Sequence, residues 1–496
     1  MSNLLTVPFL LPLFIGALLI FFAKHYRVQR FIAAFAAFIL FGVSIYLGYL
    51  VYNDPEQMLT LEVGNWAAPF GIVLVADMLS SLMIILSSFV GVICLFFAFK
   101  TIHIDREKYY FYSFFFFLLT GINGAFLTGD LFNLFVFFEV TLISSYVLIS
   151  HGGTKFQLRE SFKYVVMNMV ASAFFLVALA YLYAVTGTLN MADIASRIAT
   201  MEQQGIINVI AIIFLFVFGA KGALFPLYFW LPRSYYGPPA VVTAIFGGLL
   251  TKLGIYSIIR SFTLIFNHNI DFTHNTIILI LAGATMIFGV LGAISKFDIK
   301  QIIIYQIISQ VGFMVMGLGI FTPLALAGSI YYIMHDIIIK VALFFTVGVT
   351  KKVTGTTDIR KMGGLLRTHP MLGWIFFIAS MSLVGIPPLS GFFGKLTLVL
   401  SGIAAEHYIL IAVALIVSLL NLFSMFRIFM NVFWGEKSTT EPLITNKESF
   451  KFLRPIIPLI VLTILLGLGA EPAFQYVIDT ANQLLDPNHY IDVVLK

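Results

Sequence analysis

Long apolar runs separated by short polar loops dominate the chain, and they limit its possible folds more than any other feature. A helix needs about 20 apolar residues to cross the hydrocarbon core of a bilayer, so these runs predict about fourteen transmembrane helices. Only 10% of the 496 residues are charged, which leaves little chain for a soluble domain. Because the runs are continuous rather than alternating, a transmembrane β-barrel is excluded. The expected fold class is an all-α polytopic membrane protein, with spans near residues 4–23, 31–51, 78–99, 109–128, 131–150, 164–186, 206–231, 239–260, 276–295, 301–321, 323–350, 371–404, 408–434 and 455–470.

Cysteine content and the N-terminus add two limits. The single cysteine, Cys94, allows neither an internal disulfide nor a cysteine-ligated metal cluster. The first residues lack the basic segment of a secretory signal, so the first run is expected to be a retained span.

Lysine and arginine fall mainly on alternate loops. One set of loops carries Lys24, Arg27, Arg30, Lys100, Arg106, Lys108, Lys155, Arg159, Lys163, Arg233, Lys296, Lys300, Lys351, Lys352, Arg360, Lys361, Arg367, Lys437, Lys447, Lys451 and Arg454. The opposite loops carry Asp54, Glu56, Glu62, Asp130, Asp193, Glu202 and Asp271, with Arg197, Arg260 and Lys496 as their cations. The positive-inside rule then predicts a multi-pass protein of the cell membrane with cytoplasmic basic loops and both termini outside.

Two of the runs contain both a lysine and a proline break. The stretch 218–232, FGAKGALFPLYFWLP, contains Lys221 and Pro226, and the stretch 382–400, SLVGIPPLSGFFGKLTLVL, contains Pro387, Pro388 and Lys395. Proline removes a backbone donor and interrupts a helix, which is tolerated at membrane depth only beside protein or a wet cavity. Both runs are therefore expected to be broken helices.

The spacing of the two breaks suggests an internal repeat. They lie five spans apart, and because five is odd, tandem blocks of five spans would have opposite orientation, as in the inverted repeats of secondary transporters. This predicts N-terminal helices 1–3 in residues 1–108, one five-helix repeat in 109–260 and a second in 276–434. A cytoplasmic loop, helix 14 and a short outer tail would follow in 435–496. Two unrelated proline kinks are the alternative.

Several ionisable residues fall inside the spans, where each is costly unless paired or hydrated. Glu139 lies mid-span and is expected to pair with Lys221, because each buried charge needs an opposite one. Asp336 and Lys340 are four residues apart, in the usual position for a pair on one helix face. His335 and Lys340 are five apart and would not touch directly, although both could line a hydrated path. The remaining ionisable residues within spans are Asp77, Lys252, Lys395 and Arg427. Arg427 lies near the cytoplasmic end of its span and is expected to snorkel.

Common catalytic and cofactor motifs are missing from the sequence. It has no GxGxxG, Walker, CxxC, HExxH or nucleophile-elbow pattern, and no cluster of carboxylates suited to sodium. No cofactor, no catalytic residues, no metal ligands and no nucleic-acid partner are expected. Ion movement coupled to another process is favoured over an ATP-driven pump or a redox enzyme.

The combination of these residues resembles the antiporter-like membrane subunits shared by Mrp-type cation/proton antiporters and respiratory complex I. Segments 64–82, KGALFPLYFWLP and SKFDIKQIIIYQIISQVGFMVMGLG are most similar to the D-subunit branch of the Mrp family. The resemblance covers nearly the whole chain and implies a fourteen-helix fold with inverted five-helix repeats and a hydrated polar axis.

The resemblance also implies roles for individual residues. Glu139 and Lys221 would form a gating ion pair, Lys252 would be the central relay, and His335 and Lys340 the connecting groups. Lys395 would be the terminal proton-exchange lysine. Asp336 departs from the pattern, since it stands where a histidine or another neutral relay group is expected.

The function expected from these residues and the resemblance is a proton-translocating subunit of a multisubunit Na+/H+ antiporter. Its partners would be protons, Na+ or another monovalent cation, the lipid bilayer and other subunits of the complex. The alternative is a proton-pumping membrane subunit of an NADH or ferredoxin:quinone oxidoreductase, whose redox centres would lie in other chains. A third interpretation is a scaffold subunit whose charges only hold its neighbours.

Overall fold

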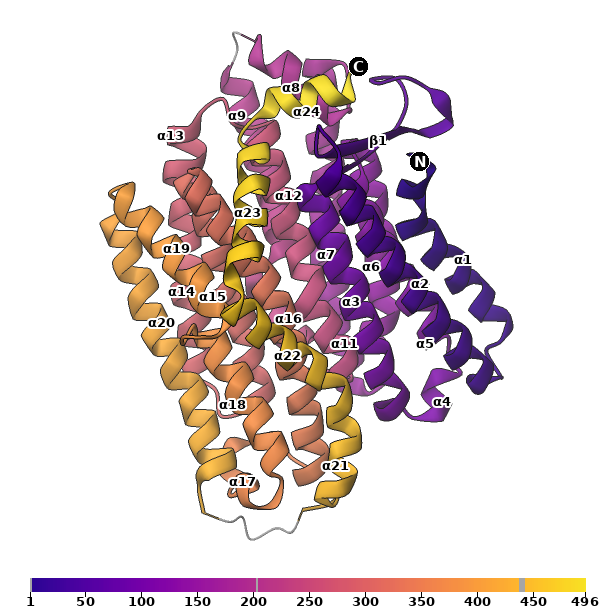
Figure 1. Cartoon of the computed structure of the whole chain (residues 1–496), viewed down its shortest axis with the longest axis vertical. Coiled ribbons are helices and arrows are strands. Elements are labelled where there is room, and N and C mark those ends of the chain that lie inside the picture. Colours follow the sequence, from indigo (N-terminus) through magenta and orange to yellow (C-terminus); the bar gives the residue numbers. More distant parts are fainter. Residues whose placement is uncertain (1, 202–203, 437–441) are drawn as a thin grey trace.

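A computed structural model describes residues 2–201, 204–436 and 442–496, so the loop charges Glu202 and Lys437 lie outside the described residues. Long helices run roughly along the longest axis of the molecule and pack side by side (Figure 1). The predicted all-α polytopic class is confirmed. A short antiparallel hairpin, β1 (Met58–Glu62) with β2 (Val73–Asp77), is an addition that the apolar runs did not predict.

The helices fall into three sets along the chain. The N-terminal set is α1 (Val7–Phe21), α2 (Tyr26–Asn53), α3 (Met78–Thr101), α4 (Ile104–Glu107), α5 (Phe111–Leu127), α6 (Leu131–Ser150), α7 (Lys155–Thr186) and α8 (Met191–Ala199). The middle set is α9 (Gln204–Gly222), α10 (Leu231–Ser234), α11 (Ala240–Ile245), α12 (Thr251–Leu264), α13 (Ile270–Phe272), α14 (Leu279–Ile294), α15 (Ile299–Ile320) and α16 (Pro323–Thr354). The C-terminal set is α17 (Leu365–Thr368), α18 (Pro370–Val384), α19 (Ser390–Ala404), α20 (Tyr408–Ile428), α21 (Asn446–Leu453), α22 (Ile457–Leu468), α23 (Ala470–Leu484) and α24 (Pro487–Val494).

Twelve helical segments among the described residues are long and apolar enough to cross a membrane. Three shorter apolar helices, α5, α18 and α19, coincide with the predicted spans 109–128 and 371–404. The chain is therefore a multi-pass membrane protein, while the count of fourteen spans stays a prediction.

Both predicted helix breaks are present. Helix α9 ends at Gly222, and the chain passes through Pro226 before the short turn Leu227–Trp230 begins. In the second broken run, α18 ends at Val384 and α19 begins at Ser390, with Pro387 and Pro388 in the gap. Each break leaves backbone groups inside the bundle that need partners other than their own helix.

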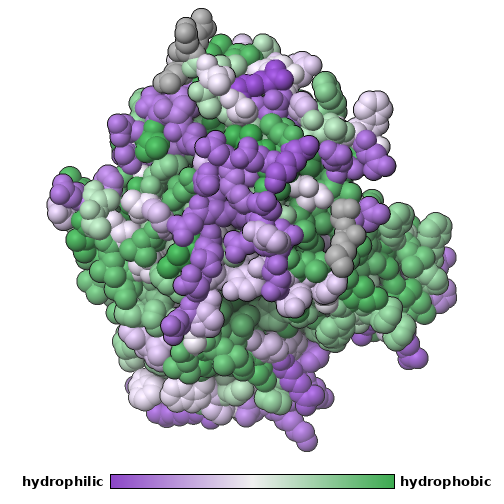
Figure 2. Space-filling view, turned by 45° about the horizontal axis from the view of Figure 1, so that its top comes forward, coloured by the Kyte–Doolittle hydropathy of each residue, from purple (hydrophilic) through white to green (hydrophobic). Residues whose placement is uncertain are grey.

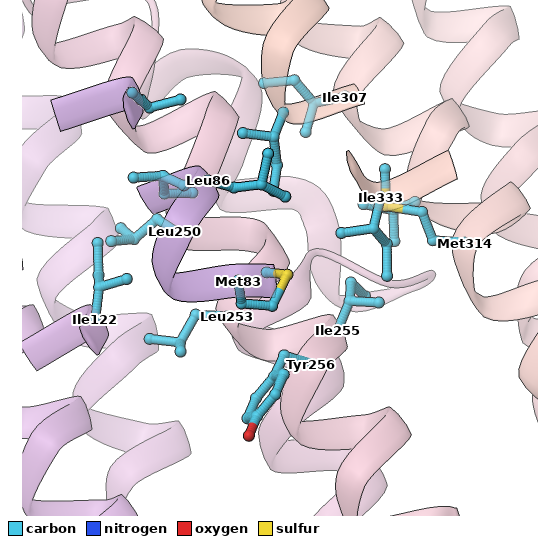
Figure 3. Packing of buried hydrophobic residues seen from close by; sticks show 14 of the residues in the cluster. Met83, Leu86, Ile122, Leu250, Leu253, Ile255, Tyr256, Ile307, Met314 and Ile333 are labelled. Carbon is cyan, nitrogen blue, oxygen red and sulfur yellow. The ribbon is translucent and has the colours of Figure 1, made fainter. Parts of the chain in front are cut away.

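The middle of the molecule consists of helices covered on all sides. Nearly all residues in the spans of α12, α15 and α16 are buried, whereas most of those in α1 and α20 are not. Buried apolar side chains fill the space between neighbouring helices, among them Leu86 of α3, Ile122 of α5, Leu253 of α12 and Ile307 of α15 (Figure 3). Because α12 carries Lys252 and α16 carries Asp336 and Lys340, these three predicted charges are buried.

The two ends of the molecule differ in the elements that they carry. The hairpin, α8 and α24 lie at the upper end in Figure 1, together with both chain termini, while α4, α17 and α21 lie at the lower end. Viewed toward the upper end, hydrophilic side chains gather across it and hydrophobic ones cover the flanks (Figure 2). The termini thus share one end, as the predicted topology requires.

The segment after α22, expected as a short outer tail, forms two further helices, α23 and α24. Helix α23 packs along α16, and α24 turns across the upper end beside α8 (Figure 1). Tyr476 and Gln483 of α23 hydrogen-bond to the backbone of Met78, so this segment also holds the start of α3.

Candidate functional site

One carboxylate, Asp336, lies between two lysines in the middle of the bundle. Lys252 Nζ is 2.6 Å from Asp336 Oδ2, and Lys340 Nζ is 3.8 Å from Asp336 Oδ1. None of the three side chains is exposed to solvent. The predicted Asp336–Lys340 contact is therefore present, but the shorter contact joins Asp336 to Lys252 on another helix.

Glycines on one side of Lys252 allow this contact. A Cβ atom placed on Gly247 or Gly248 would lie within 3 Å of Phe344 or Val341, so these glycines let the chain approach α16 closely. The segment Phe246–Leu250 is a π-helical turn, a feature that often occurs at functional sites. Lys252 Nζ also donates to the carbonyl oxygen of Gly247 at 2.7 Å, which fixes the ammonium beside Asp336.

Glu139 and Lys221 lie near each other, with Ser172 of α7 between them. The hydroxyl of Ser172 donates to Glu139 Oε1 at 2.5 Å, and Lys221 Nζ donates to Ser172 Oγ at 3.5 Å. Lys221 also lies over the ring of Phe138, 4.8 Å from its centroid. The structure thus shows a serine-bridged arrangement instead of the direct ion pair that the sequence predicts.

A small cavity of about 20 Å³ adjoins Lys221. Thr141, Tyr164 and Asn168 contribute polar groups to its wall, and Leu250 and Leu253 beside Lys252 line it too. Most of its wall is apolar, but its volume is enough for about one water molecule. The cavity thus extends from Lys221 toward the side chains that flank Lys252.

His335 is hydrogen-bonded to a group of hydroxyls at the second helix break. Its Nδ1 lies 2.7 Å from Ser390 Oγ at the start of α19, and Ser390 Oγ lies 2.5 Å from Thr463 Oγ1 of α22. Ser382 Oγ completes the group, at 2.8 Å from Thr463 Oγ1. His335 is thus bonded into the second helix break and makes no hydrogen bond to Lys340 among the described contacts.

Lys395 binds the end of the helix that precedes its own. Its Nζ donates to the carbonyl oxygens of Val384 at 2.9 Å and Leu383 at 3.4 Å. These carbonyls lie in the last turn of α18, where oxygens lack partners in their own helix and the helix dipole favours a cation. The break at Pro387 and Pro388 therefore creates the binding position of Lys395.

A chain of polar side chains that sequence analysis did not single out begins near Lys395. The aromatic rings of Phe313 and Tyr332 lie beside its ammonium. The hydroxyl of Tyr332 donates to Gln310, Gln310 Nε2 donates to Gln306 Oε1 at 3.1 Å, and Gln306 Nε2 donates to Ser424 Oγ at 2.7 Å. Gln306 and Gln310 within the apolar run 301–321 are the only sign of this chain in the sequence, and the run does not show which side chains they bind.

Two arginines bind partners that the sequence did not indicate. Arg260, expected among the outer-loop cations, is buried on α12 and pairs with Asp77 at 2.5 Å, because Asp77 begins α3 beside it. Arg427, expected to snorkel, donates to the carbonyl oxygens of Ile294 and Lys296 at the end of α14. Both form structural contacts away from the Asp336 group.

Comparison with known proteins places this arrangement in a family. Residues 128–421, more than half of the chain, match the family described as NADH:quinone oxidoreductase/Mrp antiporter, TM. A curated protein of Alkalihalophilus pseudofirmus, named as the D subunit of a Na(+)/H(+) antiporter, is 62% identical over 100% of both chains. The chain belongs to the family of Na(+)/H(+) antiporter D subunits. The D subunit of the Bacillus subtilis antiporter is 47% identical, again over 100% of both chains.

A solved structure agrees with this assignment. The structure of the Mrp complex from Dietzia sp. contains a chain with a TM-score of 0.92 and 29% identity, covering 100% of this chain and 99% of that one. The full-length identity with antiporter subunits favours the antiporter over the oxidoreductase subunit that the sequence left as its alternative. The names of these relatives are those of transporter subunits rather than enzymes.

Proposed function

We propose that this chain is the proton-translocating subunit of a multisubunit Na+/H+ antiporter in the plasma membrane, acting as a secondary ion transporter with no catalytic residues of its own. The buried group of Lys252, Asp336 and Lys340 carries the proposal. Two ammoniums and one carboxylate are electrically neutral together only when one lysine has released its proton. Since an unpaired charge in the interior is costly, this group favours a lysine that gains and loses a proton.

The proposed path begins at Glu139 and ends at Lys395. Protonation of Glu139 would weaken its bond with Ser172 and free Lys221 to move its proton through the small cavity toward Lys252. The Asp336 group would pass it along α16, with His335 and its hydroxyl partners as connecting groups. Lys395 would exchange the proton at the second break. Sodium would cross elsewhere in the complex or at an interface.

The partial exposure of Glu139 and Ser172, at the start of the proposed path, supports contact with other subunits. Glu139 and Ser172 are only partly buried, although both lie in the middle of long apolar helices. A carboxylate at that depth is costly next to lipid, so a neighbouring subunit is expected to cover it.

The orientation and the repeat are parts of the same proposal. The end that carries α4, α17 and α21 holds the basic loops and would face the cytoplasm, which places both termini outside. Residues 109–260 and 276–434 would be the two inverted repeats. Their lysines differ in position, since Lys221 precedes its proline break and Lys395 follows its own.

Transport by the purified complex in liposomes tests the proposal. Under imposed pH and sodium gradients, the complete complex should exchange Na+ for protons, and Lys252→Met should abolish exchange while the complex still assembles. Lys447→Gln, which removes an exposed cation from α21, is the matched control and should exchange normally. Full exchange by an assembled Lys252→Met complex would contradict the proposal.

A further inference from the structure

A cavity of about 560 Å³ opens at the end of the molecule that carries the basic loops. Its wall combines the end of α3, α4, the start of α7, the loop 236–239, the start of α15 and the end of α16. Both predicted repeats thus contribute to it, and it is large enough for a small ligand.

The charges around this cavity all have one sign. Arg106, Lys300, Lys351 and Lys352 line it, and none of the described lining residues is acidic. Within the described part of the chain, no carboxylate forms an ion pair with any of the four. Such a surface repels Na+ and protons and attracts an anion.

Lys300 is the deepest of these cations and is fixed in place. It is only 9% exposed, and its Nζ donates to the carbonyl oxygens of Tyr236 at 2.8 Å and Pro238 at 2.7 Å. An ammonium has three donors, so one remains for a ligand. Lys351 and Arg106 are exposed at the rim, where they can close on an anion.

The nearest carboxylate is already satisfied. Asp298 accepts hydrogen bonds from the hydroxyls of Tyr236 and Thr357 and from the backbone N–H of Gln301. It stands behind two lining residues rather than in the wall itself. It therefore does not replace an anionic ligand inside the cavity.

The inner wall of the cavity is apolar. Phe344 lines it one helical turn beyond Lys340 and packs against Gly247, whose carbonyl holds Lys252. Phe97, another lining residue, stacks on Phe345 with 3.8 Å between ring centroids. These rings separate the cavity from the Asp336 group, so the cavity is a site of its own.

We propose that this cavity binds a phosphate-bearing anion, with Lys300 at its base and Arg106, Lys351 and Lys352 around its mouth. Phosphate oxygens match the donors of lysine and arginine, and charge-assisted hydrogen bonds of this kind are strong. The phosphate group comes either from a free anion or from the headgroup of an anionic phospholipid.

Equilibrium binding of radiolabelled inorganic phosphate to the purified complex, before and after lipid removal, tests the site. The double variant K351Q/K352Q should bind at least about tenfold more weakly, because it removes two cations that can form charged hydrogen bonds with the phosphate oxygens. The double variant K108Q/K447Q removes two exposed cations that do not line the cavity and should bind like the wild type. If K351Q/K352Q fails to assemble, Arg106→Gln, at the rim, gives the same readout.

The source of the phosphate group follows from two further results. Saturable phosphate binding without lipid removal indicates a free anion. Phosphatidylglycerol that co-purifies with the wild type and is lost from K351Q/K352Q indicates a lipid headgroup.

Two outcomes overturn the proposal. One is equal phosphate and lipid binding by wild type and K351Q/K352Q, and the other is a photo-crosslinker at Val347 that captures an acidic segment of a partner subunit.

Discussion

Lys252 and Asp336 lie 2.6 Å apart although they come from different helices and neither side chain reaches the surface. Lys340 approaches the same carboxylate from the other side, at 3.8 Å. One carboxylate therefore serves two ammoniums, and removal of Asp336 would leave both without an anion. This makes Asp336, which the family resemblance did not explain, the residue on which the group depends.

Asp336→Asn should abolish Na+/H+ exchange and lower the stability of the assembled complex. Breaking a buried ion pair by removing one partner costs about 3–5 kcal/mol, because the remaining charge stays buried. Thermal unfolding of the purified complex and exchange in everted vesicles measure the two effects.

A double variant separates a structural role from a role in transport. Lys252→Met with Asp336→Leu removes both charges of the shorter contact and should recover the part of the stability that the unpaired Lys252 costs, while Lys340 still lacks its carboxylate. Exchange should remain absent if the group transfers protons. Recovery of exchange together with stability would show that the pair is only structural.

The main features of the fold follow from local sequence patterns, whereas the partners of the buried charges do not. The apolar runs, the breaks at Pro226 and Pro388 and the Asp336–Lys340 spacing are all visible within single segments. The Lys252–Asp336 contact depends on how two helices are aligned, which no spacing within one helix determines.

Hydroxyl partners such as Ser172 escape prediction for a related reason. Serine is common in membrane helices, where it bonds to its own backbone or to another helix. Its presence in a run therefore does not show which charge it serves. The prediction that Arg260 is an outer-loop cation is wrong for a similar reason. Its position at the end of a predicted span does not show that Tyr490 of α24 covers it.

Ser172→Ala should slow exchange by about tenfold, since a hydrogen bond to a charged group contributes about 1.5–3 kcal/mol. The substitution removes the bridge between Glu139 and Lys221 but leaves both charges in place. Ser172→Thr keeps a hydroxyl and should keep most of the activity. Initial rates of sodium-dependent proton movement provide the measurement.

Ser144→Ala is the matched control for this prediction. The Ser144 hydroxyl donates at 2.8 Å to the carbonyl oxygen of Val140 in its own helix. Exchange at the wild-type rate is expected. Similar losses for Ser144→Ala and Ser172→Ala would argue that general packing, not the bridge, sets the rate.

Lys395→Arg should assemble normally and lose exchange. Arginine can still donate to the carbonyls of Val384 and Leu383, so the end of α18 keeps its cation. It does not release a proton under physiological conditions, so it cannot act as a proton-exchange group. Assembly is followed by co-purification of the other subunits, and exchange is followed in vesicles.

The scaffold interpretation predicts the opposite result for the same variant. If Lys395 only holds α18, Lys395→Arg should exchange like the wild type and Lys395→Met should lower assembly before it lowers transport. An active Lys395→Arg complex would remove Lys395 from the proton path.

Gly391→Ala should prevent stable assembly, because the second helix break has no room for a methyl group. A Cβ atom there would overlap the carbonyl oxygen of Ser382 and lie 2.8 Å from His335 Nε2. Backbone carbonyls cannot rotate aside, so α19 would have to move away from α18 and from the hydroxyls that bind His335. Gly42→Ala is the control, since a Cβ atom at Gly42 would meet nothing within 4 Å. Alanine favours a helix over glycine by about 1 kcal/mol, so this control should be neutral or slightly stabilising. The amount of assembled complex in membranes and its unfolding temperature measure both effects. A Gly391→Ala complex as stable as the Gly42→Ala complex would mean that α18 and α19 are packed less tightly at Gly391 than the structure shows.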